Sequence, residues 1–296
     1  MKKIIFFIIC LLFTGSFLEV RAFTVSPVKQ IVTLEQGTGR NVKIKIRNTE
    51  RNTAKYKISV VGVKQDDQGY PVYGTNIEEA EKWVRSEQEV LEIGPGKEIE
   101  ASFKINIPKG TYPGSHYVGL SAEPMLLGDE NKNFIGKLIS LLLIEVSGTV
   151  NETLSITKWS GEKSFYLSLE KLKLNVGLKN DGNTELPIKG KIRLYNWLDK
   201  KTAEGDVFLG NTILPQAQRT TEVLLPDFNN WQLPGIYRAQ LDLVYGRTGQ
   251  KISVQYAFWY ISIYWLIAIG LILSIVIWTL IKKIKNKREE ETPFKI

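Results

Sequence analysis

Residues 41–48 read NVKIKIRN, with apolar and polar side chains in strict alternation. Successive side chains of a β-strand point to opposite faces, so Val42, Ile44 and Ile46 are predicted to face a core. The same two-residue period recurs in residues 99–107, 172–178, 188–194, 237–243 and 252–258. Many short strands of this kind, separated by turns rich in Gly, Pro and Asn, predict antiparallel β-sandwiches.

The strands and turns occur in the same order in two halves of the chain. The strand at 41–47 leads into the turn NTERNT, and the strand at 171–179 leads into the turn NDGNT. Because Asn, Asp and Gly favour tight turns, both links are predicted to be of the hairpin type. A repeated order over about 130 residues favours two copies of one sandwich, with the boundary near residues 148–152.

The C-terminal part carries a predicted transmembrane helix at residues 261–281. No charged residue occurs in this stretch, and a helix of ~20 apolar residues crosses a hydrocarbon core of ~30 Å. Trp259, Tyr260, Tyr264 and Trp265 gather at its front end, and the basic tail at 282–296 follows it. Aromatic residues favour the headgroup layer and basic flanks favour the cytoplasm, so a single-pass type I cell-membrane protein is predicted, with an extracellular ectodomain and a cytoplasmic C-terminus.

The first 22 residues have the layout of a signal peptide, with two lysines before an apolar run. Its removal would take away Cys10, the one cysteine, and a mature chain without disulfides is typical of bacterial surface domains. Of the formal net charge of +8, +2 lies in residues 1–22 and +3 in residues 282–296, which leaves +3 for the ectodomain. No concentrated basic patch is visible, so nucleic acid is not expected as a partner.

Enzyme activity is not expected. His116 is the one histidine, so a metal site with two histidines cannot be built, and no cofactor-binding motif is present. A lone histidine without a positioned partner is an unpromising general base, and no nucleophile elbow or phosphate-binding loop occurs. We therefore expect no catalytic residue, metal or cofactor.

Candidate binding residues come from the first half. Tyr70, Tyr73 and Tyr112 would line a sugar-binding surface or serve as ordinary packing residues. Residues 76–86 have helical spacing, which predicts a short amphipathic helix or 3-10 turn; Trp83 would be a glycan or partner platform or, as the favoured alternative, fill the core. Residues 136–148, with Leu141 and Leu143, would form either a central strand covered on both faces or an edge that pairs with a partner strand.

Short motifs then point to a family. The first half resembles the immunoglobulin-like N-domain of pilus chaperones at residues 25–27, 46–48, 93–97, 107–109 and 113–114. The whole layout is similar to that of the membrane-anchored WxL-interacting proteins of Gram-positive bacteria, and the motifs at 178–183, 214–215, 235–237 and 245–246 agree with it. This resemblance implies peptidoglycan binding by residues 23–148 and contact with a host or surface protein by residues 149–258.

The sequence therefore predicts an all-β protein of two tandem immunoglobulin-like sandwiches followed by one transmembrane helix. The leading hypothesis is a non-enzymatic surface protein that binds the cell wall (peptidoglycan), another surface protein, or both. The alternatives are a membrane-tethered assembly chaperone that works by β-strand addition, and an accessory subunit of a membrane complex that makes its contact through residues 261–281.

Overall fold

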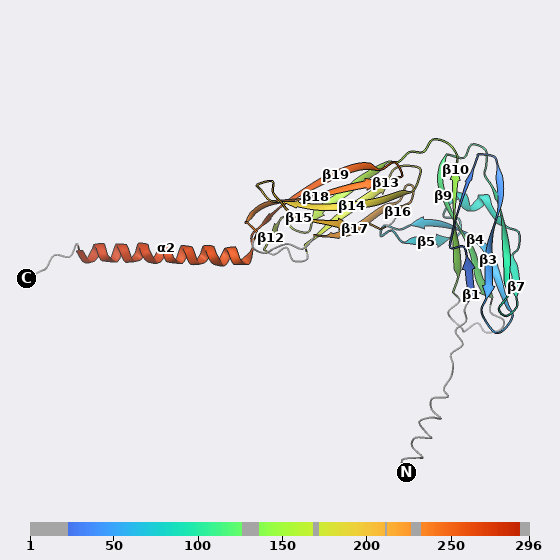
Figure 1. Ribbon diagram of the computed structural model, residues 1–296, viewed down its shortest axis with the longest axis horizontal. Helices are drawn as coiled ribbons and strands as arrows, with labels where there is room; N and C mark the ends of the chain where they lie inside the picture. The colour runs from blue at the N-terminus through green and yellow to red at the C-terminus, as the bar shows by residue number, and fades with distance from the viewer. Residues whose placement is uncertain (1–22, 126–135, 168–171, 211, 226–231, 291–296) are drawn as a thin grey trace, which may run out of the picture. The chain divides into compact units, whose positions relative to one another are not determined.

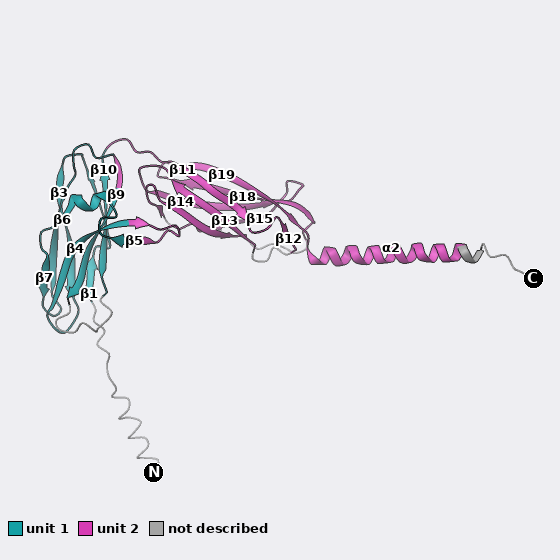
Figure 2. Cartoon of the chain, turned by 180° about the vertical axis from the view of Figure 1, so that it is seen from behind, with its two compact units in different colours: residues 1–63, 73–112, 116–147 teal, residues 64–72, 113–115, 148–296 magenta. Residues whose placement is uncertain are grey.

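The computed structural model describes residues 23–125, 136–167, 172–210, 212–225 and 232–290 (Figure 1). The predicted signal peptide lies outside these residues. The chain forms two compact units (Figure 2): unit 1 comprises residues up to 63, 73–112 and 116–147, and unit 2 comprises residues 64–72, 113–115 and those from 148 onward. Both units are built from strands, and the described chain ends in one long helix. The predicted fold class is confirmed.

Two sheets form unit 1. The first has the order β1-β3-β8-β6, and the second has the order β2-β10-β9-β4-β5, with β7 paired to β4. The bounds are β1 (Phe23–Ser26), β2 (Lys29–Leu34), β3 (Gly39–Asn48), β4 (Ala54–Gln65), β5 (Pro71–Gly74), β6 (Val84–Ser86), β7 (Val90–Ile93), β8 (Glu98–Asn106), β9 (Gly114–Met125) and β10 (Leu138–Val146).

The core of unit 1 follows the alternation seen in the sequence. In β3, Ile44 and Ile46 are fully buried while the lysines between them are exposed. The paired strand β8 buries Ala101, Phe103 and Ile105 in the same way. Each exposed face then carries cross-strand ion pairs, such as Lys43 Nζ to Glu100 Oε2 at 2.8 Å, which contribute little at a solvated surface. Burial of the apolar face is therefore what holds these strands together.

The first strand of the sandwich is split between the two sheets. β1 pairs antiparallel with β3, the Ser26–Pro27 peptide bond is cis, and β2 then pairs parallel with β10. Residues 29–34 of β2 lie beside residues 141–146 of β10. β10 is thus an internal strand between β2 and β9 over this length, with Leu142, Leu143 and Ile144 fully buried. Of the two predicted alternatives for this segment, the structure has the covered central strand.

The segment between β5 and β6 contains the 3-10 helix η1 (Glu79–Trp83). Its acidic residues come early and Lys82 late, as the sequence indicated. Trp83 is 5% exposed and packs within the core of unit 1, where its ring meets the His116 ring at 4.6 Å between centroids. The indole therefore fills the core, which was the favoured alternative.

Two further sheets form unit 2. Their orders are β11-β13-β17 and β12-β19-β18-β14-β15, with β16 paired to β14. The bounds are β11 (Leu154–Gly161), β12 (Phe165–Tyr166), β13 (Lys173–Asn180), β14 (Leu186–Tyr195), β15 (Lys201–Val207), β16 (Thr212–Ile213), β17 (Gln218–Leu224), β18 (Gly235–Tyr245) and β19 (Gln250–Tyr260). The core lies between the sheets and includes Leu174, Leu194, Tyr237 and Leu241, all fully buried.

The turns predicted to be hairpins are not hairpins. β3 and β4 lie in different sheets, and so do β13 and β14, so each turn carries the chain from one sheet of its sandwich to the other. The turn residues favour a tight reversal, but the strands that follow pair with later strands, which local sequence does not reveal.

A buried asparagine holds each of these turns. Asn48 Nδ2 donates to Asn52 O and Ile93 O, both at 2.8 Å, and its Oδ1 accepts from Glu50 N at 2.9 Å. Asn180 repeats this pattern: Nδ2 donates to Thr184 O at 2.8 Å and Ile213 O at 3.0 Å, and Oδ1 accepts from Gly182 N at 2.9 Å. Both side chains are fully buried. The internal repeat seen in the sequence thus extends to individual hydrogen bonds.

The last element is the helix α2 (Ile263–Glu290), long and apolar enough to cross a membrane. It begins after Ser262, whose Oγ accepts a hydrogen bond from Tyr264 N at 3.1 Å and so caps the helix. The predicted span at 261–281 is therefore helical from Ile263, and the helix continues into the basic segment as far as Glu290.

Replacing the buried asparagine of unit 2 should destabilise that unit. Asn180→Ala leaves two buried carbonyls without their donor and one amide without its acceptor, so we expect a loss of about 3 kcal/mol in the free energy of unfolding. Urea unfolding of the detergent-solubilised chain measures this loss. Asn41→Ala, at an exposed position of β3, is the control and should change stability by less than about 0.5 kcal/mol. Equal effects of the two substitutions would contradict the role given to Asn180.

Candidate functional site

A free sheet edge is the first candidate site. β2 is the terminal strand of its sheet, so within the described part of the chain no strand lies along one side of its backbone. Leu141 N donates to Val28 O at 2.8 Å and Ser147 N donates to Leu34 O at 2.9 Å. In a parallel pair the residues that face the neighbouring strand alternate, so residues 30, 32 and 34 face β10 while Ile31 and Thr33 direct their N–H and C=O groups outward. These groups are placed to pair with an added strand.

Apolar side chains accompany this edge. Val28 is 77% exposed and Ile31 is 56% exposed. Neighbouring residues of β2 are held in place: Val32 is buried, and Gln30 Nε2 donates to Lys43 O of β3 at 2.9 Å. Gln30 thus joins the two sheets at their open side. We call β2 together with Val28 the free edge.

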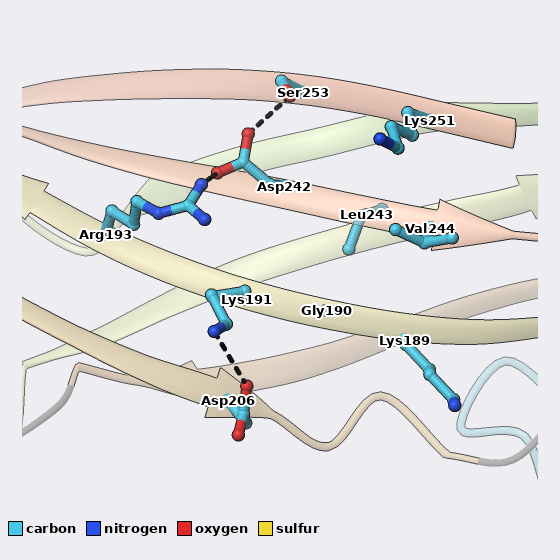
Figure 3. Close-up of a pocket in the computed structure, with 10 residues that line it drawn as sticks. All are labelled: Lys189, Gly190, Lys191, Arg193, Asp206, Asp242, Leu243, Val244, Lys251 and Ser253. Carbon is cyan, nitrogen blue, oxygen red and sulfur yellow. Dashed lines mark hydrogen bonds and ion pairs between the residues drawn. The ribbon is translucent and has the colours of Figure 1, made fainter. Parts of the chain in front are cut away.

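A shallow hollow on the outer face of the larger sheet of unit 2 is the second candidate site. It measures about 390 Å³ and is lined from β14, β15, β18 and β19 (Figure 3). The strand registers arrange its side chains in rows across the sheet. One row is Asp206, Lys191, Asp242 and Ser253, and the next is Lys189, Val244 and Lys251.

The charges of the first row and its neighbours are paired. Arg193 forms an ion pair with Asp242, and Ser253 Oγ donates to Asp242 Oδ1 at 2.5 Å (Figure 3). Lys191 Nζ lies 3.0 Å from Glu204 Oε1 and 3.8 Å from Asp206 Oδ1. These groups therefore neutralise one another and leave little net charge in this half of the hollow.

The second row differs because its two lysines face no carboxylate. Within the part of the chain that the structure describes, neither Lys189 nor Lys251 forms an ion pair, and Val244 lies between them on β18. Two strand spacings separate β14 from β19, so the Cα atoms of Lys189 and Lys251 are ~10 Å apart. This end of the hollow offers two ammonium groups around an apolar floor, an arrangement suited to an anion.

The one histidine of the chain packs against an aromatic ring of unit 1. The His116 ring lies against Trp83, and its Nε2 is 3.2 Å from Tyr112 O. Burial is the main cause that lowers the pKa of His116, and it therefore favours the neutral ring. Among the residues described, no group of three or more His, Cys, Asp or Glu side chains is placed to hold a metal ion.

The candidate residues named from the sequence do not meet in one place. Tyr70, Tyr73 and Tyr112 are exposed, whereas Trp83 and Leu143 are buried and Leu141 is half-buried beside Lys29. As ligand-binding residues the three tyrosines remain a prediction. Trp83 and Leu143 present almost no surface to a ligand, because one fills the core and the other lies within an internal strand.

Sequence reasoning missed the residues of both candidate sites. Alternation alone places Lys189, Lys191 and Arg193 on one face of β14, but only the strand register shows which of them meets a carboxylate. At the free edge, Pro27 was the available signal, since a proline inside an alternating stretch marks a break or an edge.

Comparisons with known proteins give matches by structure but not by sequence. No family model matches the chain, and no curated protein matches it. Among solved structures it is similar to a chain from the chaperone–tip adhesin complex of CFA/I fimbriae (TM-score 0.46, 10% identity, 81% of this chain and 99% of that one). It is also similar to the class 5 fimbriae chaperone CfaA (TM-score 0.43, 11% identity, 81% and 99%) and to a chain from the CsuC–CsuE pre-assembly complex of Acinetobacter baumannii (TM-score 0.38, 13% identity, 68% and 89%).

These matches concern the arrangement of strands and assign no ligand to this chain. Membership among the WxL-interacting proteins stays a prediction.

The ion pairs beside the hollow should persist at low pH. Hydrogen bonds from Lys201 first, and then Lys191, lower the pKa of Glu204 from 4.5 to about 2. A pKa lower in the folded state means that these pairs stabilise the fold above pH 4.5 and that this stabilisation is lost as the pH falls towards 2. An NMR titration of the Glu204 carboxyl group should show this, and Lys201→Met should raise the midpoint. Lys158→Met, on the other sheet of unit 2, should leave it unchanged; an equal shift would contradict the assignment.

Proposed function

We propose that this chain is a membrane-anchored, non-enzymatic assembly factor that binds an extended segment of an exported protein along the free edge. The observation that carries this proposal is the outward-facing backbone of Ile31 and Thr33 on a terminal strand with exposed apolar neighbours. Backbone hydrogen bonds to an added strand supply affinity, and contacts with alternate side chains supply selectivity. The chemistry of the partner is therefore an extended, partly apolar peptide.

The position of the binding edge corrects one detail of the strand-addition hypothesis. Residues 141–146 of β10 are covered by β2, so a partner strand would add to β2 rather than to that part of β10. The parallel pairing of β2 with β10 also leaves the backbone N–H and C=O of Ile31 directed away from β10, and its side chain is exposed. An incoming strand would thus extend the six-stranded sheet of unit 1 by one.

The anchor in this proposal is α2. Its apolar stretch ends at Lys282, and three more lysines follow before Glu289. Because basic flanks are enriched on the cytoplasmic side, we propose that both units are extracellular and that the C-terminus is cytoplasmic. Exported proteins would meet the free edge as they leave the membrane. Removal of residues 1–22 as a signal peptide belongs to the same proposal.

Ile31→Pro should abolish partner binding while keeping the fold. Proline removes an N–H that faces away from β10, and edge strands tolerate proline at such positions. A photo-crosslinker at Thr33, in the full chain within its native cells, should capture one continuous segment of an exported protein. Ile31→Pro should reduce this product at least tenfold, whereas Ile31→Thr, which keeps the backbone donor, should reduce it less.

Two controls define the outcome of this experiment. The crosslinker at Lys104, exposed on the internal strand β8, should capture little. Val32→Pro removes the donor to β10 and should lower the melting temperature, in contrast to Ile31→Pro. Similar capture from positions 33 and 104 would exclude strand addition at the free edge.

The hollow favours a second candidate function, the binding of an anionic cell-wall polymer. Lys189 and Lys251 flank Val244, and among the described residues neither lysine forms an ion pair with a carboxylate. Peptidoglycan and its attached polymers carry carboxylates or phosphates, which suit such a pair of cations. This candidate assigns wall contact to unit 2, whereas the sequence resemblance implied it for residues 23–148.

Removing both lysines should weaken binding to purified cell walls. For Lys189→Ala with Lys251→Ala we expect a loss of roughly tenfold in affinity, because ion pairs at exposed lysines each contribute roughly 0.2–1 kcal/mol and about 1.4 kcal/mol is tenfold. Sedimentation of the detergent-solubilised chain with purified sacculi measures it. The charge-matched control is Lys57→Ala with Lys158→Ala, two exposed lysines outside the hollow. If both pairs lose affinity equally, binding is a general charge effect and not a property of the hollow.

A further inference from the structure

One end of unit 2 carries a cluster of exposed apolar side chains. We call them the apolar rim: Phe165, Trp197, Leu198, Leu233, Ile236 and Trp259, each between 41 and 56% exposed. A soluble surface seldom gathers several large apolar residues at one end of a domain without a partner. Aromatic and leucine side chains together are typical of surfaces that meet lipid headgroups.

The strand registers bring these residues together. Phe165 of β12 pairs with Trp259 of β19, and Ile236 of β18 pairs with the same Trp259 from the other side. Trp197, in the turn after β14, lies directly over Gly235: a Cβ placed on this glycine would come within 2.5 Å of the indole. Figure 1 shows β12 and the ends of β18 and β19 on the side of the sandwich where α2 begins.

The distance between this end and the helix is very short. β19 ends at Tyr260 and α2 begins at Ile263, so only Ile261 and Ser262 lie between them. Ile261 N donates to Tyr166 O, and Trp265 Nε1 donates to Gln232 O, both at 3.1 Å. The first turn of the helix is thus bonded to the strand and loop that carry Phe165 and Leu233.

The length of the uncharged stretch then determines how far unit 2 lies from the hydrocarbon core of the bilayer. The helical part of the uncharged stretch, residues 263–281, measures about 28 Å, which just matches a hydrocarbon core of ~30 Å and leaves no slack. Two residues extend at most ~7 Å, and each interfacial layer is about 5–8 Å deep. Side chains level with Tyr260 must therefore lie within the headgroup layer when α2 spans the bilayer.

We propose that the apolar rim is a lipid-contact surface that sits in the outer headgroup layer of the bilayer crossed by α2. This inference rests on the proposed anchoring by α2. Because the rim surrounds the start of the helix on several strands, its contact with lipid fixes the angle of unit 2 to the membrane as well as its height. Arg238 forms an ion pair with Asp199 in the turn that carries Trp197 and Leu198.

A pair of positions on one strand tests the proposal. Ile236 and Val244 lie on the same face of β18 and are 41% and 40% exposed, but they are ~27 Å apart along the strand. The full chain with Cys10→Ser has no other cysteine, so Ile236→Cys or Val244→Cys can each carry one environment-sensitive fluorophore. The labelled chains are reconstituted into phosphatidylcholine–phosphatidylglycerol vesicles that contain a lipid with a quencher in its headgroup region.

The expected result is at least threefold quenching of the label at 236 and almost none at 244. Leu198→Cys, in an exposed turn where folding is not at risk, should behave like Ile236→Cys. Equal quenching at 236 and 244 would overturn the proposal, and so would quenching at 236 that arises only between labelled copies of the chain at high protein density. Alkaline extraction distinguishes failure of the anchoring hypothesis from failure of the rim hypothesis. Release of the chain from the vesicles would contradict anchoring by α2. A retained chain with an unquenched label at position 236 would contradict only the lipid contact of the apolar rim.

Discussion

The fold depends on a buried amide at the point where each sandwich crosses from one sheet to the other. Asn48 and Asn180 each supply two donors and one acceptor to backbone groups that would otherwise be buried without partners. An unsatisfied buried carbonyl costs about 1–3 kcal/mol, so few other residues can stand at these positions. The backbone N–H groups of the two asparagines are used as well, donating to Lys97 O and Ala217 O at 3.0 Å. Each amide thereby ties the crossing turn to the loop that leads into the third strand of its smaller sheet.

The features of the fold that could be predicted from the sequence are those set by residues close together in the chain. Strands, core faces and the repeated order are local patterns, and residues 41–48 already show which side chains are buried. The parallel pairing of β2 with β10 joins residues more than 100 positions apart, and the strands that follow the crossing turns, β4 and β14, pair with the later strands β9 and β18; alternation cannot express either kind of pairing. For the same reason Leu143 was offered as a partner-binding residue although it is fully buried, while Ile31, which is exposed at the true edge, was not singled out.

Charge gives a second example of this limit. Residues 23–281 carry a net charge of only +3, spread along the sequence, and no basic patch was expected. In the fold, cross-strand carboxylates neutralise Lys191 and Arg193 but not Lys189 or Lys251. The strand register thus decides which lysines meet a carboxylate, and it leaves Lys189 and Lys251 as two neighbouring cations. One residue of slip of β14 against β18 would turn Lys189 to the other face of the sheet and break up the pair.

The two surfaces of unit 2 can act together because they lie at opposite ends of β18. Ile236 belongs to the apolar rim and Val244 to the floor between the two lysines, ~27 Å away along the strand. The Debye length at physiological ionic strength is about 8 Å, so anionic headgroups at the rim are screened from the hollow. If the rim holds unit 2 at the proposed height, the hollow lies out of reach of headgroups in the same bilayer. Under that proposal its cations would be available to an anion that extends outward from the membrane, as a wall polymer would, and not to a lipid.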